Sequence, residues 1–115
     1  MEVDYIRGTH PSFMPVYAIL GGAISPTEFV AKCTPHLSNL IEKRDTSFIL
    51  SDEPGRPLLA IKFLNGRGFR NCTIYHVGKT PRHTIGKYPT KGTYISYGEV
   101  EAALREDADE VILLE

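Results

Sequence analysis

Short runs of apolar residues, each closed by a turn signal, recur along the chain and predict β-strands. The first run, residues 16–20 (VYAIL), is almost wholly apolar and ends at two glycines, as expected of a central parallel strand covered on both faces. Residues 47–51 (SFILS) and 72–77 (CTIYHV) have a similar length, and the second of them is rich in the β-branched and aromatic residues that strands favour. A last apolar run covers residues 110–114, so we expect four strands.

The segment after the first strand carries the signals of a helix start. In Ser25-Pro26-Thr27-Glu28 the serine hydroxyl can cap a free amide, the proline suits the first helical position, and the glutamate can reach back to the cap. Apolar residues then recur at helical spacing as far as Ile41. Because Pro35 lacks an amide hydrogen, we expect it to kink or break this helix near Lys32.

Two further helices are predicted, separated by a long connection. Residues 57–64 are almost wholly apolar and indicate a buried helix, and Asn65-Gly66 can supply the left-handed residue with which many helices end. A second capping box at residues 96–99 opens a helix that continues to Glu106. Residues 78–95 show no helical or alternating pattern, and a connection of that length in a compact domain is usually functional or disordered. We favour a functional loop.

The alternation of strands and helices predicts an α/β fold with right-handed crossovers and a parallel sheet. We expect a minimal Rossmann-like, three-layer α/β/α domain at residues 16–115, with a mainly parallel four-stranded sheet of order 3-2-1-4. An irregular N-terminal arm at residues 1–15 precedes it. In that strand order the chain reverses direction between the first and fourth strands, and ligands of open α/β sheets bind outside the carboxyl strand ends at such a point.

Composition places the chain among ordinary globular proteins, since 42% of its residues are hydrophobic and 23% are charged. Cys33 and Cys72 lie far apart and no Cys/His group has zinc-ligand spacing, so we expect two buried thiols, no metal and a reducing compartment. Residues 1–14 lack the pattern of a secretory leader, and no apolar run approaches the roughly 18 residues of a membrane span. The expected location is cytoplasmic, without membrane contact.

Charge is unevenly distributed although the formal net charge is only −1. Residues 62–92 hold seven Lys or Arg and no acid, whereas residues 99–115 hold seven acids and one Arg. A positive side of the molecule follows, and both simple solvation and an anionic ligand remain open explanations for it. Nucleic acid is an unlikely partner, because the overall charge is slightly negative and no recognised binding motif is present.

Three segments are expected to meet at the carboxyl edge of the sheet, each leading into a helix. Glycine lets a backbone approach an oxyanion closely, and free amides at a helix start favour phosphate or carboxylate. A tight turn remains an alternative role for the glycines, as capping does for the serine before the first helix. The ligand-binding candidates in the first two segments are Gly21, Gly22, Ser25, Ser51, Asp52 and Gly55.

Side chains in these segments could supply the remaining chemistry. Asp52 and Glu53 could accept hydrogen bonds from ribose hydroxyls or act as a general base, or one of them could merely cap the second helix. Basic side chains suit phosphate, and Tyr88, Tyr94 and Tyr97 could stack on a base or pack the loop onto the sheet. The candidates in the basic loop are Lys79, Arg82, Lys87 and Tyr88. The histidines at 76 and 83 have no nucleophile spaced to form a triad, which favours structural or solvated roles.

The order of residues 21–25 (GGAIS), 51–55 (SDEPG) and 75–82 (YHVGKTPR) resembles the SLOG superfamily of Rossmann-like proteins, which includes nucleoside deoxyribosyltransferase-like and LOG-like proteins. The resemblance covers about residues 16–115 and is closest over residues 75–108. It implies a nucleotide or nucleotide-sugar ligand rather than one reaction. By position, the resemblance implies that six residues contact the ligand: Gly22, Ser25, Asp52, Gly55, Arg82 and Lys87.

The chain also departs from the pattern of that superfamily. The Pro-Gly-Gly-x-Gly-Thr segment of its base-releasing enzymes is missing, Ala23-Ile24 replaces the arginine of the first loop, and Arg56-Pro57 follows Gly55 in place of Ala-Asp. We therefore expect a binding protein for a phosphate-bearing nucleotide or ADP-ribose-like molecule, a sensor or sequestering protein that needs no cofactor. The alternatives are an N-glycosidic hydrolase or deoxyribosyltransferase that uses Asp52 or Glu53, and a ligand-free adaptor. The apolar second helix and the open sheet edge favour a homo-oligomer.

Overall fold

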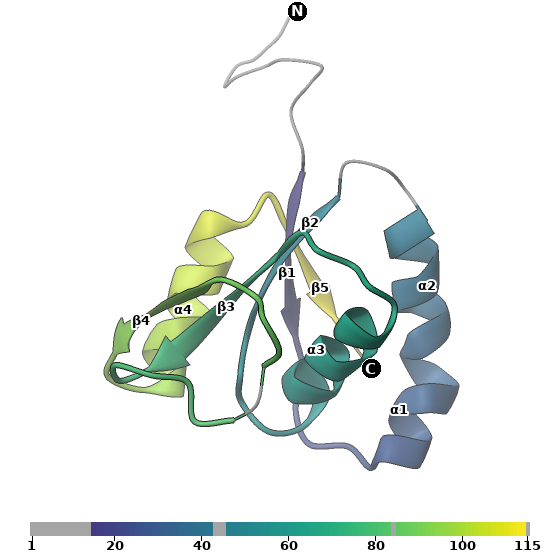
Figure 1. Cartoon of the computed structure of the whole chain (residues 1–115), viewed down its shortest axis with the longest axis horizontal. Helices are drawn as coiled ribbons and strands as arrows, with labels where there is room; N and C mark the ends of the chain where they lie inside the picture. The colour runs from purple at the N-terminus through teal and green to yellow at the C-terminus, as the bar shows by residue number, and fades with distance from the viewer. Residues whose placement is uncertain (1–14, 43–45, 84, 115) are drawn as a thin grey trace, which may run out of the picture.

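The computed structural model describes residues 15–42, 46–83 and 85–114, and these form one five-stranded, all-parallel sheet. Its strand order is β4-β3-β2-β1-β5. The strands, shown in Figure 1, are β1 (Val16–Leu20), β2 (Ser47–Ser51), β3 (Cys72–Val77), β4 (Thr90–Tyr94) and β5 (Glu110–Leu113). The α/β class and the parallel sheet are therefore confirmed, and the four expected strands have the expected relative order, as β3-β2-β1-β5.

Helices cover both faces of the sheet (Figure 1). On one face lie α1 (Pro26–Lys32), α2 (Thr34–Glu42) and α3 (Arg56–Gly66), whose apolar residues share a core cluster with the side chains of β1, β2 and β3 that point to that face. On the other face α4 (Tyr97–Asp107) packs through Val100 and Leu104 against Ala18, Ile49 and Tyr75. The strands are buried on both sides, which explains why β1 and β2 read as nearly unbroken apolar runs.

Local signals set the helix boundaries as expected. The Ser25 hydroxyl accepts a hydrogen bond from the Glu28 amide at 3.2 Å, and the Ser96 hydroxyl accepts one from the Glu99 amide at 3.2 Å. The break expected from Pro35 is confirmed, because α1 ends at Lys32 and the proline lies in the first turn of α2, where its missing donor costs least.

The expectation of four strands, with one long loop over residues 78–95, is wrong because the later part of that segment forms a fifth strand. Residues 90–94 form β4, which pairs in parallel with β3 at the edge of the sheet. Its sequence (TKGTY) shows no apolar alternation because the strand is largely exposed, and it is held by backbone pairing rather than by a buried face. An edge strand of this kind leaves little trace in a hydrophobic pattern.

The pairing of β3 with β4 contains an irregularity that a glycine makes possible. The register shifts between Tyr75 and Val77, and Thr93 has a left-handed φ of 68°. At Gly92 a Cβ atom would lie 2.1 Å from Cε1 of the buried His76 imidazole, so only glycine leaves room for that ring. His76 is thus a packed side chain of the sheet edge, which agrees with the structural role expected for it.

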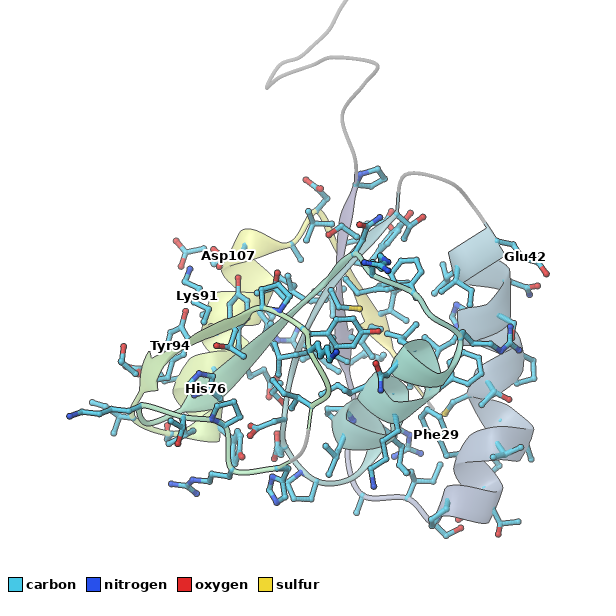
Figure 2. All side chains as sticks on the ribbon, in the orientation of Figure 1. Phe29, Glu42, His76, Lys91, Tyr94 and Asp107 are labelled. Carbon is cyan, nitrogen blue, oxygen red and sulfur yellow. The ribbon has the colours of Figure 1, made fainter. Side chains whose placement is uncertain are left out.

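Side chains fasten β4 to α4 on the other face. The Tyr75 and Tyr94 rings stack with centroids 5.9 Å apart, and the Tyr75 hydroxyl donates to Asp107 Oδ2 at 2.6 Å. Lys91 Nζ lies 3.4 Å from the same carboxylate oxygen (Figure 2). This cluster ties the edge strand to the last turn of α4.

The end of α3 differs from the expectation in one respect. The helix includes Asn65 and Gly66, and the left-handed residue after it is Gly68, with a φ of 71°. The Phe69 amide donates to the Leu64 carbonyl at 3.0 Å across that turn. The helix continues two residues further because Gly68 can adopt the left-handed conformation equally well.

Other expectations concern burial and the chain ends. Cys33 and Cys72 are buried and free, as expected of two packed thiols. Of the expected N-terminal arm, all but Pro15 lies outside the described residues. Within the described ranges, none of the helices combines the length and the apolar character that crossing a membrane would require.

Candidate functional site

Asp52 holds together three segments at the carboxyl edge of the sheet. It follows β2 directly and its side chain is completely buried. Its Oδ2 accepts a hydrogen bond from the Arg82 amide at 2.7 Å, and its Oδ1 accepts one from the Tyr97 hydroxyl at 3.0 Å. The Asp52 side chain does not cap α3, which has no side-chain cap. The carboxylate instead joins the end of β2 to the loop after β3 and to the first turn of α4.

Two further groups surround this carboxylate. His83 Nδ1 lies 3.9 Å from Asp52 Oδ2, and that nitrogen is buried without a hydrogen-bond partner among the described residues. The Arg82 guanidinium lies 5.9 Å from the centre of the Tyr97 ring. Burial, and then the hydrogen bond to Asp52, raise the pKa of Tyr97 to about 12, so this hydroxyl remains a donor at neutral pH.

The glycine-rich turn after β1 is filled by a side chain of the neighbouring loop. Arg56 Nη1 donates to the carbonyls of Gly22 and Ala23 at 3.2 and 3.0 Å, and the Arg56 amide donates to the Gly22 carbonyl at 2.9 Å. A Cβ atom at Gly21 would lie 2.5 Å from Arg56 Cδ, and one at Gly55, whose φ is 104°, would lie 2.8 Å from the Gly22 carbonyl oxygen. These two glycines therefore allow the two loops to approach each other.

The starts of α3 and α4 differ in the amides that they leave for a ligand. At α3 the amides of Arg56 and Leu58 donate to the carbonyls of Gly22 and Glu53. At α4, within the described part of the chain, the amides of Tyr97 and Gly98 have no hydrogen-bond acceptor. The next two amides donate to Ser96, that of Glu99 to the hydroxyl and that of Val100 to the carbonyl. The start of α4, beside Arg82, is thus the better place for an anion.

A small hollow of about 30 Å³ opens between the ends of β1 and β2 and the inner side of α4. Its polar lining includes two carboxylates, Glu53 and Glu101. Partial burial, and then the charges of Glu101 and Asp52, raise the pKa of Glu53. Carboxylates at this position accept hydrogen bonds from hydroxyl groups and repel phosphate. The described residues that line the hollow are Leu20, Gly21, Ser51, Glu53, Pro57, Tyr97, Val100, Glu101 and Leu104.

The residues predicted for the site fall into two groups. The first group lies at or beside the carboxyl ends of β1, β2 and β3, and its members are Gly21, Gly22, Ser25, Ser51, Asp52, Glu53, Gly55, Lys79 and Arg82. Ser25 caps α1 with its hydroxyl, and Lys79 is exposed in the turn after β3. Lys87 and Tyr88 lie elsewhere, because they precede β4 and the Tyr88 hydroxyl donates to the Phe69 carbonyl just before β3.

Sequence analysis did not predict several residues of this edge as part of the site. It considered Tyr97 for stacking on a base or for packing the loop onto the sheet, and His83 as structural or solvated, and it did not consider Glu101. Tyr97 and Glu101 lie in the capped helix and His83 lies in the basic loop before it, and these positions were the available signal. For the contacts of Arg56 no local signal existed, although the residue stood out as a departure from the pattern of the superfamily.

Among the described residues no group of three His, Cys, Asp or Glu side chains could hold a metal ion. Comparison of the chain with protein-family models, with curated proteins and with solved structures finds no match.

Proposed function

We propose that the protein binds a phosphate-bearing nucleotide or an ADP-ribose-like derivative at the carboxyl ends of β1 and β2, as a sensor or sequestering protein. The observation that carries the proposal is the Asp52 junction, which fixes the backbone of Arg82 and the ring of Tyr97 beside the acid-lined hollow. In a parallel, Rossmann-like sheet, ligands bind at this edge where the crossovers change sides, and α4 lies on the face opposite α1, α2 and α3.

The phosphate and the sugar of such a ligand suit different groups at this edge of the sheet. Phosphate suits the Arg82 guanidinium and the amides of Tyr97 and Gly98, because a helix start carries partial positive charge. Sugar hydroxyls suit Glu53 and Glu101, which accept hydrogen bonds. The site thus combines acceptors for hydroxyl groups with donors for an anion.

Titration calorimetry of the full chain with ADP-ribose, AMP, ribose 5-phosphate and adenosine tests this proposal. We expect binding tighter than about 1 mM, or roughly −4 kcal/mol, for phosphate-bearing compounds, and weaker binding of adenosine. Arg82→Ala keeps the backbone hydrogen bond to Asp52 and should weaken phosphate ligands about tenfold. Lys32→Gln, on the exposed end of α1, is the matched control. Absence of binding by every phosphate compound would refute the proposal.

A second candidate is cleavage of an N-glycosidic bond, favoured by one observation. The raised pKa of Glu53 beside Glu101 is the environment in which one carboxyl group can donate a proton while another stays ionised. Incubation with nucleosides, nucleotides and NAD, followed by chromatography, detects free base. Release that Glu53→Gln abolishes would establish an enzyme, and no release from any of these compounds would leave the binding function alone.

A further inference from the structure

A second concave surface lies away from the carboxyl edge, where the turn after α3 meets the segment before β4. The two connections run side by side at the amino-terminal side of β3, and between them lies a groove of about 570 Å³. This volume falls within the range of small-molecule sites. The lining residues are Asn65, Gly68, Phe69, Arg70, Gly86, Lys87, Tyr88 and Pro89.

Contacts between the two connections fix the shape of the groove. The Tyr88 hydroxyl donates to the Phe69 carbonyl at 2.5 Å and so joins one wall to the other. Gly86, with a φ of 72°, lies so close to Asn65 that a Cβ atom would be 3.0 Å from its side-chain oxygen. Behind this segment Ile85 is buried in the core. The groove is therefore largely preformed, and little ordering would oppose binding.

The lining combines aromatic surface with positive charge. Phe69 and Tyr88 are half-buried, pack on one side against the core and line the groove with their remaining surface. Arg70 and Lys87 stand on opposite walls, are exposed, and make no ion pair with any described residue. Among the residues that the structure describes, no acidic side chain lines the groove. A flat apolar group and an anion fit this lining, and a cation does not.

We propose that this groove binds a nucleobase joined to phosphate. The base would lie against Phe69 and Tyr88, as bases stack on aromatic side chains in single-strand binding sites. The phosphate would lie between Arg70 and Lys87. This chemistry occurs both in a free mononucleotide and in a single-stranded nucleic acid. The groove is independent of the site at the carboxyl edge, which uses other residues and accepts hydroxyl groups through carboxylates.

The test uses 15N-labelled full-length protein and records backbone amide shifts during titration with AMP. We expect shifts for Gly68, Arg70 and Lys87, and weaker or no shifts with adenosine, which lacks phosphate, and with pyrophosphate, which lacks a base. Arg70→Gln and Lys87→Gln should each weaken this binding about fivefold, the factor that corresponds to roughly 1 kcal/mol for an exposed charge contact. Lys32→Gln should leave it unchanged, and circular dichroism checks the fold of each variant.

The outcomes separate this proposal from the function proposed for the carboxyl edge. Shifts confined to Gly22, Ser51 and Gly98 would support the edge site and overturn the groove. Shifts confined to the groove residues would support the groove and overturn the edge site. Equal binding of AMP by the wild type and by the Arg70→Gln/Lys87→Gln double variant also overturns the groove proposal. A short oligo(dA) assigns the source, because groove shifts at lower concentration than with AMP indicate single-stranded nucleic acid, and the opposite order indicates a free nucleotide.

Discussion

The Tyr97 hydroxyl donates to Asp52 Oδ1 at 3.0 Å, and this hydrogen bond fixes the first turn of α4 against the end of β2. The other oxygen of the same carboxylate accepts from the Arg82 amide at 2.7 Å. A completely buried carboxylate is stable in this position because both oxygens have donors. The proposed site at the carboxyl edge depends on this junction, which sets the positions of Arg82 and of the start of α4.

Asp52→Ala should destabilise the protein by about 3 kcal/mol, because it leaves the Tyr97 hydroxyl and the Arg82 amide without their acceptor. Urea unfolding followed by circular dichroism measures the loss. Glu106→Ala is the matched control, since this carboxylate is exposed on α4, and it should change stability by less than about 0.5 kcal/mol. Equal effects of the two substitutions would contradict the role given to Asp52.

Gly92→Ala should cost more than about 2 kcal/mol, because the new Cβ would lie 2.1 Å from a carbon of the buried His76 ring, and either the ring or the edge strand must move. Gly98→Ala, in the first turn of α4, meets nothing closer than 3.6 Å and should stabilise the protein by up to about 1 kcal/mol. Thermal and urea unfolding of both variants give the comparison. A neutral Gly92→Ala would show that β4 does not pack on His76.

Glu53→Gln should stabilise the protein in a pH-dependent way. The folded-state pKa of Glu53 is raised, so the folded state favours the protonated form, and ionisation destabilises it as pH rises through that pKa. The variant should match the wild type below the ordinary value of 4.5 and exceed it at pH 7. Urea midpoints at pH 4 and pH 7 measure the difference. In a Glu101→Gln background the gain at pH 7 should shrink, since the Glu101 charge is one of its causes.

Tyr75→Phe should raise the pKa of Asp107 toward its ordinary value of 3.8, because the hydrogen bond from the Tyr75 hydroxyl is the main cause that lowers it. The lowered pKa stabilises the fold above the ordinary value, and this stability is lost as pH falls through the folded-state pKa. NMR titration of the Asp107 side chain measures the change. Lys91→Gln should also raise this pKa, since the Lys91 ammonium is a further cause of the lowering, and an unchanged pKa in Tyr75→Phe would contradict the contact.

Much of the fold follows from signals that act over a few residues. The strands at 16–20, 47–51 and 72–77 and the caps at Ser25 and Ser96 were predicted, and so was the helix break near Lys32. A capping hydrogen bond joins residues three apart, a proline removes its own donor, and an unbroken apolar run can only be buried. Such effects need no knowledge of distant parts of the chain.

What the tertiary structure decided depends on residues that meet only after folding. The edge strand β4 exists because its backbone pairs with β3 and Gly92 makes room for His76, and neither leaves an apolar pattern. The basic segment divides, with Arg82 at the carboxyl edge and Lys87 at the groove beside Phe69. The sequence by itself determined four of the five strands, the helices and the edge at which their loops meet. The partners of each polar side chain there depend on contacts between residues 30 or more positions apart, such as Asp52 with Arg82 and with Tyr97.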